Sequence, residues 1–435
     1  MKHVVIIGGG FAGLTCARTL ASHSDIRITL IDKNNFQQFQ PLLYQVATAA
    51  LEPSNAAFSL RAVLKRYSNV DIKLGSVVSV DLKARSAETV EGQKYQGDYL
   101  VLAAGSQANF FGTPGADKHA YPLYSLHDAE LLRSRLIAAL ELADRDPSLI
   151  AKGALNFVII GAGPTGTELA GTLGDMTQGG LKEVFKDLDL SKAQVFLIDH
   201  GYSVLSAFSP KSQKYATSVL EQRGVQVRLG IAAKEVAPEY VLLSDGTKIL
   251  TRTVIWAGGL KASSLSGNLG VAPGHGGRID VQPDFGVKGF PGVYALGDFA
   301  NIVGTDGKPL PQLASVAEQS GKWCAKNIAA AIAGEPAEPF HYLDKGIMAM
   351  IGRNAAVAEV GEHRHELQGT VAFAAWLGVH AALLTTLRAK LETFIEWGWV
   401  YFAGSHAAPI LDRITQANID WSADEEEETG SGLKN

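Results

Sequence analysis

Two short apolar runs rich in β-branched residues each lead through closely spaced glycines into a helical pattern. Residues 4–7 precede a helical stretch at 14–22, and residues 157–160 precede another at 167–173. A short apolar run that is bounded by glycine and followed by helical periodicity is typical of a βα unit. The repeat therefore predicts two copies of one α/β unit, each with a parallel sheet.

The rest of the chain alternates between strand-like and helix-like patterns. Short alternating runs at residues 71–74, 77–82 and 85–90 predict an antiparallel insertion in the first unit, and residues 225–256 alternate similarly. Residues 341–367 predict a small sheet. Further helices are expected at residues 57–67, 125–145 and 311–333.

The glycines after the first apolar run have the spacing that a dinucleotide site needs. Gly8 allows a tight turn, Gly10 lets a pyrophosphate approach the backbone, and Gly13 lets the helix lie close to the strand. The helix N-terminus then offers its N–H groups to the phosphates. The next strand ends at Asp32, 19 residues after Gly13, where a carboxylate can accept hydrogen bonds from a ribose diol.

The second copy repeats this arrangement with Gly161, Gly163 and Gly166. Its second strand ends at Asp199, 33 residues after Gly166, so residues 175–192 are interpreted as an insertion in the crossover. A carboxylate at Asp199 repels a 2′-phosphate and binds a free 2′-hydroxyl, which favours NADH over NADPH. The sequence therefore predicts two Rossmann-like dinucleotide-binding domains.

Small residues and one carboxylate at the ends of later strands are further candidate cofactor contacts. A buried strand at residues 98–103 and a similar run at 254–259 lead into small residues that allow close approach of a ligand. A third strand, within residues 292–298, ends in a carboxylate placed to meet a ribityl hydroxyl. The candidates are Ala104, Gly105, Gly258, Gly297 and Asp298.

Residues 35–45 are too polar and irregular for a strand and contain Pro41, so a loop is expected there. One interpretation is that this loop lays its backbone along a flat cofactor ring, with Leu43 as a contact. The other is an ordinary surface connection. The local pattern leaves both interpretations open.

Residues 371–402 have a helical pattern with one strongly apolar side, and Lys390 lies opposite that side with other polar residues. The helix either packs on the core of the protein or lies in a membrane interface. Trp376, Trp397 and Trp399 favour the interface, because indole rings prefer that boundary.

Composition limits the class of protein and its partners. With 435 residues, the chain is long enough for two or three domains, and its net charge of −5 gives no basic surface for a nucleic-acid partner. Cys16 and Cys324 form no paired-cysteine motif, which excludes disulfide reductases and disfavours sulfide:quinone oxidoreductases. The sequence has no secretory leader pattern and no uncharged apolar run of ~18–20 residues, so a soluble or peripheral protein is expected.

Together these motifs resemble those of the type II NADH dehydrogenases, the single-subunit, non-pumping NADH:quinone oxidoreductases of respiratory membranes. The resemblance covers almost the whole chain. It is carried by residues 8–13 with Asp32, 39–47, 161–170, 295–298, 344–346, 351–353 and 376–380. It implies non-covalent FAD in the first unit, NADH in the second, hydride transfer from NADH to the flavin, and transfer of two electrons to a membrane quinone.

The resemblance also implies how the chain is divided. The C-terminal region is expected to attach the protein peripherally to the cytoplasmic face of the cell membrane, with the lipid bilayer surface as a partner and with room for a homodimer. The expected divisions are an FAD-binding domain at 1–115 and 276–340, an NADH-binding domain at 116–275, a C-terminal sheet with amphipathic helices at 341–419, and an acidic, disordered tail at 420–435.

Three polar residues are candidates for catalytic roles. Glu168, on the first turn of the second unit's helix, points toward the domain junction, or else it only complements the helix dipole. By resemblance, Lys345 lies near the quinone and delivers protons or steadies reduced flavin; the alternative is a solvated lysine in a turn. Gln319 lies near the start of the helix expected at 311–333, where the family usually carries two glutamines, but Ser315 replaces the first, which puts that quinone contact in question.

Two other functions remain open at this point. A soluble NADH-dependent flavoprotein reductase of a ferredoxin-like partner would use both nucleotide units, but it leaves the aromatic C-terminal helix unexplained. A nucleotide-binding redox sensor without turnover would not need Glu168 and Lys345. Oxidation of NADH by a short-chain quinone distinguishes an enzyme from such a sensor.

Overall fold

The first unit is a five-stranded parallel sheet. The computed structural model describes residues 1–182, 184–305 and 307–402. The sheet has the order β21 (Val293–Ala295), β9 (Tyr99–Leu102), β1 (Lys2–Ile7), β2 (Ile26–Asp32) and β5 (Val70–Leu74). Helices α1 (Phe11–Leu20) and α8 (Ala314–Ala333) pack against each other and share its apolar core.

The second unit has a five-stranded parallel sheet of the same arrangement, except that its edge strand precedes the other four in the chain. Its order is β11 (Ala120–Pro122), β18 (Thr253–Trp256), β12 (Asn156–Ile160), β13 (Gln194–Asp199) and β14 (Val225–Leu229), and all neighbours are parallel. Its main helices are α5 (Leu126–Arg145), α6 (Pro164–Asp175) and α7 (Pro210–Gln222). The glycine-rich turn follows the central strand in both units, so the predicted α/β repeat is confirmed.

Each unit carries a three-stranded antiparallel sheet in the connection between two of its parallel strands, β5 and β9 in the first unit and β14 and β18 in the second. These are β6 (Val77–Asp81), β7 (Ser86–Thr89) and β8 (Lys94–Gln96) in the first unit, and β15 (Ala233–Val236), β16 (Tyr240–Leu243) and β17 (Lys248–Leu250) in the second. The assignment of residues 71–74 to this insertion was wrong, because they belong to β5, which pairs in parallel with β2. As an edge strand, β5 is half-exposed, and this produces the alternation of an antiparallel strand.

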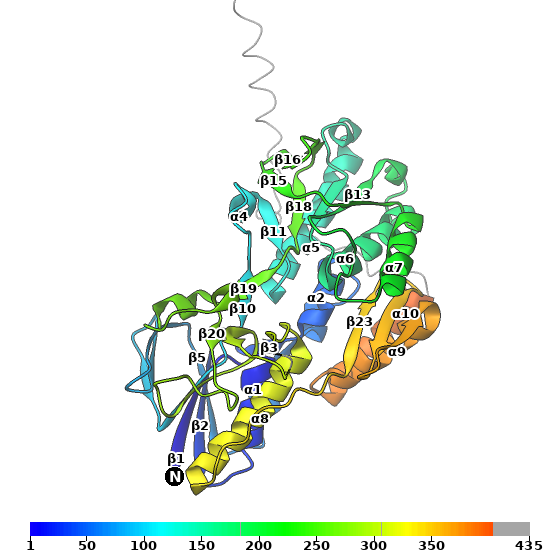
Figure 1. The fold of residues 1–435 in the computed structure, drawn as a ribbon. Coiled ribbons are helices and arrows are strands. Elements are labelled where there is room, and N and C mark those ends of the chain that lie inside the picture. Colours follow the sequence, from blue (N-terminus) through cyan, green and yellow to red (C-terminus); the bar gives the residue numbers. More distant parts are fainter. Residues whose placement is uncertain (183, 306, 403–435) are drawn as a thin grey trace, which may run out of the picture.

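A short antiparallel ribbon links the two units. It pairs β10 (Ser106–Ala108) with β19 (Leu260–Ala262), where the chain leaves the first unit and later returns to it. Figure 1 shows the two parallel sheets in separate lobes with β10 and β19 between them. The remaining short elements are α4 (Ala116–His119), β20 (Ile279–Asp280) and β22 (Ala300–Asn301).

Residues 35–45 are more regular than expected. β3 (Phe36–Gln38) pairs with β4 (Ala57–Ser59), and the chain then forms a 3₁₀ turn and helix α2 (Leu43–Ala47). The predicted loop was therefore wrong for most of this segment. All five side chains of α2 are buried, and α2 packs against α5, so tertiary packing stabilises a helix that local propensity does not. The helix expected at 57–67 is also shorter, at α3 (Leu60–Leu64).

The C-terminal part packs on the second unit. β23 (Gly346–Met350), β24 (Ala356–Val360) and β25 (His365–Gln368) form an antiparallel sheet, followed by α9 (Gly369–Leu383) and α10 (Leu387–Phe402). In Figure 1 these orange elements lie beside α6 and α7, and contacts of α6 with β23 and of α7 with β24 join the two parts.

The prediction of one continuous helix over residues 371–402 was wrong. Backbone angles of −60° and 140° at Leu384 end α9, and the Leu384 side chain turns into the core. Trp376 and Trp397, which had favoured a membrane interface, are also buried, so their indole rings contribute to the core instead. The expected acidic tail lies outside the described residues.

Helix α10 buries one stripe of side chains and exposes several large apolar side chains on the rest of its surface. Ala389, Thr393 and Trp397 form its buried stripe, at four-residue spacing. The exposed large apolar side chains of this part of the chain are Val371, Val379, Leu383, Leu387, Leu391, Phe394, Ile395 and Trp399. Exposed apolar surface on this scale marks a site that contacts a membrane or another protein. Among the described residues, no helix has the length and apolar character needed to span a bilayer.

Candidate functional site

Two of the three glycines in the first turn are explained by contacts within the protein. Gly8 has a φ of +102°, and a Cβ there would collide with the Ala103 carbonyl oxygen. A Cβ at Gly13 would collide with the Gly8 carbonyl oxygen, so Gly13 allows α1 to lie on the turn. At Gly10, by contrast, no other atom lies within 4 Å of where a Cβ would be. The turn therefore keeps open the space at the start of α1 that a pyrophosphate requires.

Asp32 lies beside this turn at the end of β2. Its Oδ2 accepts a hydrogen bond from the Gly9 N–H at 2.5 Å, and its Oδ1 accepts one from the Asn34 N–H at 2.6 Å. Burial raises the pKa of Asp32, while these two N–H donors and nearby Lys33 act in the opposite direction. The carboxylate is thus fixed next to the open space at Gly10, where a ribose diol can reach it.

A second, partly buried carboxylate lies near the end of another strand of the first unit. Asp298 follows β21, and its Oδ2 lies 3.0 Å from the Ser106 Oγ, which lies 2.8 Å from the Tyr124 hydroxyl. Burial raises the pKa of Asp298, and burial together with the Asp298 charge raises the pKa of Tyr124 to about 12. Gly297 has a φ of +58° and packs against Ala12 of α1. Ser106 follows the predicted small residues Ala104 and Gly105, whereas Tyr124 belongs to no motif and was missed by the sequence analysis.

The predicted small residues of the first unit meet at this place. Ala104 and Gly105 directly follow β9 and precede Ser106, so they lie between Asp298 and the glycine turn. Leu43 is the first residue of α2, and its side chain is buried in the core that α2 shares with α5 and the second unit.

The second unit has the same geometry as the first. Gly161 has a φ of +108° and would collide with the Ala257 carbonyl oxygen if it carried a Cβ, and Gly166 would collide with that of Gly161. The Cβ position of Gly163 is again open. Asp199 accepts hydrogen bonds from the Ala162 and Gly201 N–H groups, both at 2.6 Å. Its register is therefore the same as that of Asp32, despite the longer crossover before it.

Gly258 follows β18, the strand equivalent to β9. Its nearest neighbour is the indole of Trp256, which donates a hydrogen bond to the Asn109 carbonyl oxygen at 2.8 Å. The predicted cofactor residues of the second unit thus collect at the carboxyl ends of its parallel strands, where α/β sheets bind ligands.

One face of α6 docks on the turn between β23 and β24. Glu168 Oε1 accepts a hydrogen bond from the Met350 N–H at 3.2 Å, and Asp175 Oδ2 accepts one from the Arg353 N–H at 2.6 Å. Gly171 lies between them in the helix, and a Cβ there would collide with the Ile351 carbonyl oxygen. This spacing places the three residues on one side of the helix.

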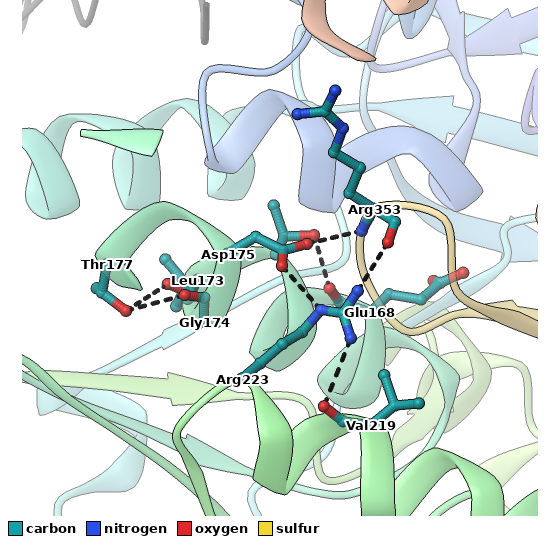
Figure 2. Close-up of polar contacts among 9 residues, drawn as sticks. Glu168, Leu173, Gly174, Asp175, Thr177, Val219, Arg223 and Arg353 are labelled. Carbon is teal, nitrogen blue, oxygen red and sulfur yellow. Dashed lines mark hydrogen bonds and ion pairs between the residues drawn. The ribbon is translucent and has the colours of Figure 1, made fainter. Parts of the chain in front are cut away.

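Arg223 of α7 completes this docking contact. Figure 2 shows its guanidinium between Asp175 and Arg353. Its Nε lies 2.8 Å from Asp175 Oδ1, and its Nη2 donates to the Arg353 carbonyl oxygen at 2.7 Å. A well-defined ion pair therefore holds the turn that presents the Met350 N–H to Glu168.

Glu168 is buried without a counter-charge. Burial raises the pKa of its carboxyl group to about 8, while the Met350 N–H and the nearby indole of Trp376 act in the opposite direction. No charged side chain of the described residues contributes to this shift. At neutral pH, Glu168 is therefore mostly protonated, which suits a group that gives or takes one proton.

Gln319 and Lys345 lie together, but away from Glu168. The Gln319 amide makes two hydrogen bonds with the backbone of Leu343, at 2.9 and 3.0 Å. Two residues later the exposed Lys345 precedes β23, whose other end carries Met350. Five strand residues span about 16 Å, so Lys345 and Glu168 face different regions. Ser315, in place of the usual glutamine, lies 2.9 Å from the Tyr342 hydroxyl through its Oγ.

Comparison with known proteins decides the family. The profile of the pyridine nucleotide-disulphide oxidoreductases matches residues 2–321. The type II NADH:quinone oxidoreductase Ndh of Mycobacterium tuberculosis is 37% identical over 410 residues, which cover 91% of this chain and 87% of the relative. The chain belongs to the type II NADH:quinone oxidoreductase family. The resemblance drawn from the sequence motifs is thereby confirmed.

Other type II NADH:quinone oxidoreductases and solved structures agree with this assignment. The enzyme of Haemophilus influenzae is 26% identical over 412 residues, covering 87% of this chain and 93% of the relative. The structure of NDH2 from Plasmodium falciparum in complex with NADH matches with a TM-score of 0.85 at 19% identity, covering 93% of this chain and 99% of that one. At that identity the match supports the fold, with its two parallel sheets and its C-terminal helices.

Proposed function

We propose that this protein oxidises NADH and reduces a membrane quinone through bound FAD, as a type II NADH:quinone oxidoreductase. The observation that carries the proposal is the pair of matching turns, at Gly10 and Gly163, each open at a helix start and each flanked by a hydrogen-bonded aspartate. One chain thus offers two dinucleotide sites. Such a pair suits electron transfer from one nucleotide to the other.

The first unit suits FAD. Gly10 and the start of α1 would receive the pyrophosphate, Asp32 the ribose, and Asp298 the ribityl chain, while Ala104 and Gly105 leave room beside them. Bound non-covalently, FAD supplies the ability to accept a hydride and to release two electrons. The residues of this unit hold and orient it and exclude water.

The second unit suits NADH. Gly163 and the start of α6 would receive its pyrophosphate, and Asp199 would accept a hydrogen bond from the 2′-hydroxyl of the adenosine ribose. The carboxylate repels a 2′-phosphate, so NADPH is disfavoured.

Glu168, Gln319 and Lys345 act at the quinone end of the reaction. Glu168 is mostly neutral at pH 7 and exchanges a proton at the junction between the second unit and the C-terminal sheet. Gln319 fixes the backbone before Lys345, which offers an exposed positive charge and a proton. The separation of Lys345 from Glu168 implies two places at which protons enter, rather than one shared pair.

The exposed face of α10 attaches the protein to the cytoplasmic surface of the cell membrane. Leu387, Leu391, Phe394, Ile395 and Trp399 all lie on it. Inserting four or five such side chains contributes ~1.5–3 kcal/mol each, which suffices for attachment. A homodimer is the alternative occupant of the same face.

Steady-state oxidation of NADH tests the proposed activity. We expect the purified protein to oxidise NADH only when a short-chain quinone is present, at a rate proportional to bound FAD. Activity with a ferredoxin-like protein and none with quinone would contradict the proposal and favour a soluble reductase. Binding of NADH without turnover would favour a redox sensor.

A further inference from the structure

A buried chain of polar contacts connects α10 to α2 and β23. The Trp397 Nε1–H of α10 donates to Gln45 Oε1 at 2.7 Å. The Gln45 Nε2 donates to the Tyr44 hydroxyl at 2.9 Å, and this hydroxyl donates to the Met350 sulfur at 3.2 Å. Tyr44, Gln45, Met350 and Trp397 are each at most 3% exposed. Hydrogen bonds in such a dry environment are costly to leave unmade.

This series of hydrogen bonds ends at Met350, the residue that also binds Glu168. The backbone N–H of Met350 donates to Glu168 Oε1, while its side chain receives the Tyr44 hydroxyl. A second contact path runs through the aromatic rings. Trp376 lies next to the Glu168 carboxyl group, and its ring centroid lies 6.4 Å from that of Tyr44 and 5.7 Å from that of Trp397. Both paths start at Trp397 and reach the same carboxyl group.

Trp397, in the buried stripe of α10, is one of the residues that fix this helix to the core. Ala389 and Thr393 occupy the earlier positions of that stripe, and Trp397 adds both a large ring and the bond to Gln45. The opposite side of the helix carries the exposed Phe394 and Ile395. A shift of α10 therefore acts directly on Gln45 and Trp376.

We propose that Gln45 and Trp397 are positioning residues for Glu168, through which the packing of α10 fixes the hydrogen bond that Glu168 accepts from Met350. The importance of this for turnover rests on the proposed role of Glu168 in quinone reduction. Neither residue contacts a nucleotide site described above. Their action is on the geometry of the carboxyl group.

The pH dependence of Glu168 ionisation reports on the geometry of its hydrogen bond with Met350, because the other groups around it do not change charge in the same pH range. Trp376 of α9 lies next to the carboxyl group, Tyr44 of α2 packs against Trp376, and His380 stacks on Trp376 with ring centroids 3.9 Å apart. Burial lowers the pKa of His380 to about 4, so this ring is neutral where Glu168 titrates. The Asp175 and Arg223 pair lies two helical turns away along α6 and does not contribute to the pKa of Glu168.

The test compares the pH dependence of thermal unfolding for FAD-loaded variants. Trp397→Phe keeps a ring but removes the donor to Gln45, and Gln45→Met removes the amide while keeping the volume similar. The hydrogen bond from the Met350 N–H stabilises the ionised form of Glu168. Either change weakens this hydrogen bond and should therefore raise the pKa of Glu168. The Tm is expected to fall as the pH increases and Glu168 ionises. We expect the pH at the midpoint of this fall to be higher by about half a unit or more in both variants.

A control variant removes an indole hydrogen bond that lies outside this network. Trp323→Phe, on α8, loses a 3.1 Å hydrogen bond to the Glu338 carbonyl oxygen and should leave the midpoint unchanged. In the Glu168→Gln background, Trp397→Phe and Gln45→Met should shift no midpoint. The proposal is overturned if both variants keep the wild-type midpoint, if Trp323→Phe shifts it equally, or if the shift persists without the Glu168 carboxyl group. None of these measurements uses quinone. If the protein did not reduce quinone, the expected shifts of the midpoint would still be observed.

Discussion

Replacing Glu168 by glutamine should remove a loss of folding stability that grows as the pH rises. The amide keeps an oxygen that can accept the hydrogen bond from the Met350 N–H, so the packing around α6 is retained. The carboxyl group has a pKa of about 8 in the folded protein and an ordinary value of 4.5 in the unfolded chain. At 1.36 kcal/mol per pKa unit, this difference corresponds to about 5 kcal/mol.

The direction of this effect follows from proton binding. Between pH 4.5 and about 8, the folded protein keeps a proton on Glu168 that the unfolded chain has lost. The contribution of this group is therefore most favourable below pH 4.5 and is lost as the pH rises through about 8. His380 acts oppositely, because its lowered pKa reduces stability as the pH falls from 6.5 toward 4. Comparing each variant with wild type at the same pH cancels this second contribution.

Thermal unfolding followed by flavin fluorescence measures the difference. An unfolding entropy of roughly 2.1 cal/mol/K per residue gives about 0.9 kcal/mol per degree if the whole chain unfolds together. The Tm of Glu168→Gln relative to wild type should therefore rise by about 4 °C from pH 5 to pH 8.5, and by more if a smaller part unfolds. Glu362→Gln, an exposed change in the neighbouring turn, serves as the control and should show no such trend. A constant difference between Glu168→Gln and wild type across this pH range would refute the reasoning.

Three further changes test the nucleotide sites and the surface. Asp199→Asn should raise the NADPH:NADH ratio of kcat/KM at least tenfold, because the repulsion of a 2′-phosphate is removed. Gly163→Val should raise KM for NADH more than tenfold with little change in Tm, because its Cβ meets open space in the protein but the pyrophosphate in the complex. The double change Phe394→Ser and Ile395→Ser should release the protein from vesicles, whereas the wild type should resist high salt and yield to detergent.

Each of these changes has an outcome that contradicts its reasoning. An unchanged cofactor ratio in the Asp199 variant would mean that another residue reads the ribose. A Gly163 variant with normal KM would place the pyrophosphate elsewhere. Unaltered vesicle binding of the Phe394 and Ile395 variant, together with a change from dimer to monomer, would assign this face to a second copy of the chain.

The repeated units could be predicted because their signals are local. Gly13 lies against the Gly8 carbonyl oxygen and Asp32 accepts a hydrogen bond from the Gly9 N–H, so both are required by contacts within one βαβ unit, and their spacing predicts the geometry that the structure shows. Gly161 and Asp199 repeat it, and the insertion between them changes only the crossover. The same logic placed the strands that end at Gly105 and Asp298.

The errors arose where distant segments pack together. Leu43 lies in a helix rather than a loop, because contacts with α5 outweigh its weak local propensity. Trp376 and Trp397 fit an amphipathic membrane helix by sequence, yet both are buried in the core, Trp376 beside Glu168 and Trp397 against Trp376. A helical wheel cannot show that the chain bends at Leu384, since the bend depends on the core into which the Leu384 side chain packs.

The candidate catalytic residues were found individually, but their arrangement was not. Glu168 could be named from its place in the motif, whereas its partner Met350 lies 182 residues away in the chain. The separation of Lys345 from Glu168 likewise depends on the direction of β23. Tyr124 had no sequence signal, although it lies within the network of Asp298 and Ser106.

The central claim is that one chain carries electrons from NADH through FAD to quinone, and an anaerobic titration of the flavin spectrum tests it most directly. We predict that the purified protein has the absorption bands of oxidised flavin, that one equivalent of NADH bleaches them while NADPH at the same concentration does not, and that one equivalent of short-chain quinone restores them. A flavin that NADH leaves oxidised, or a reduced flavin that quinone does not reoxidise, would contradict the account.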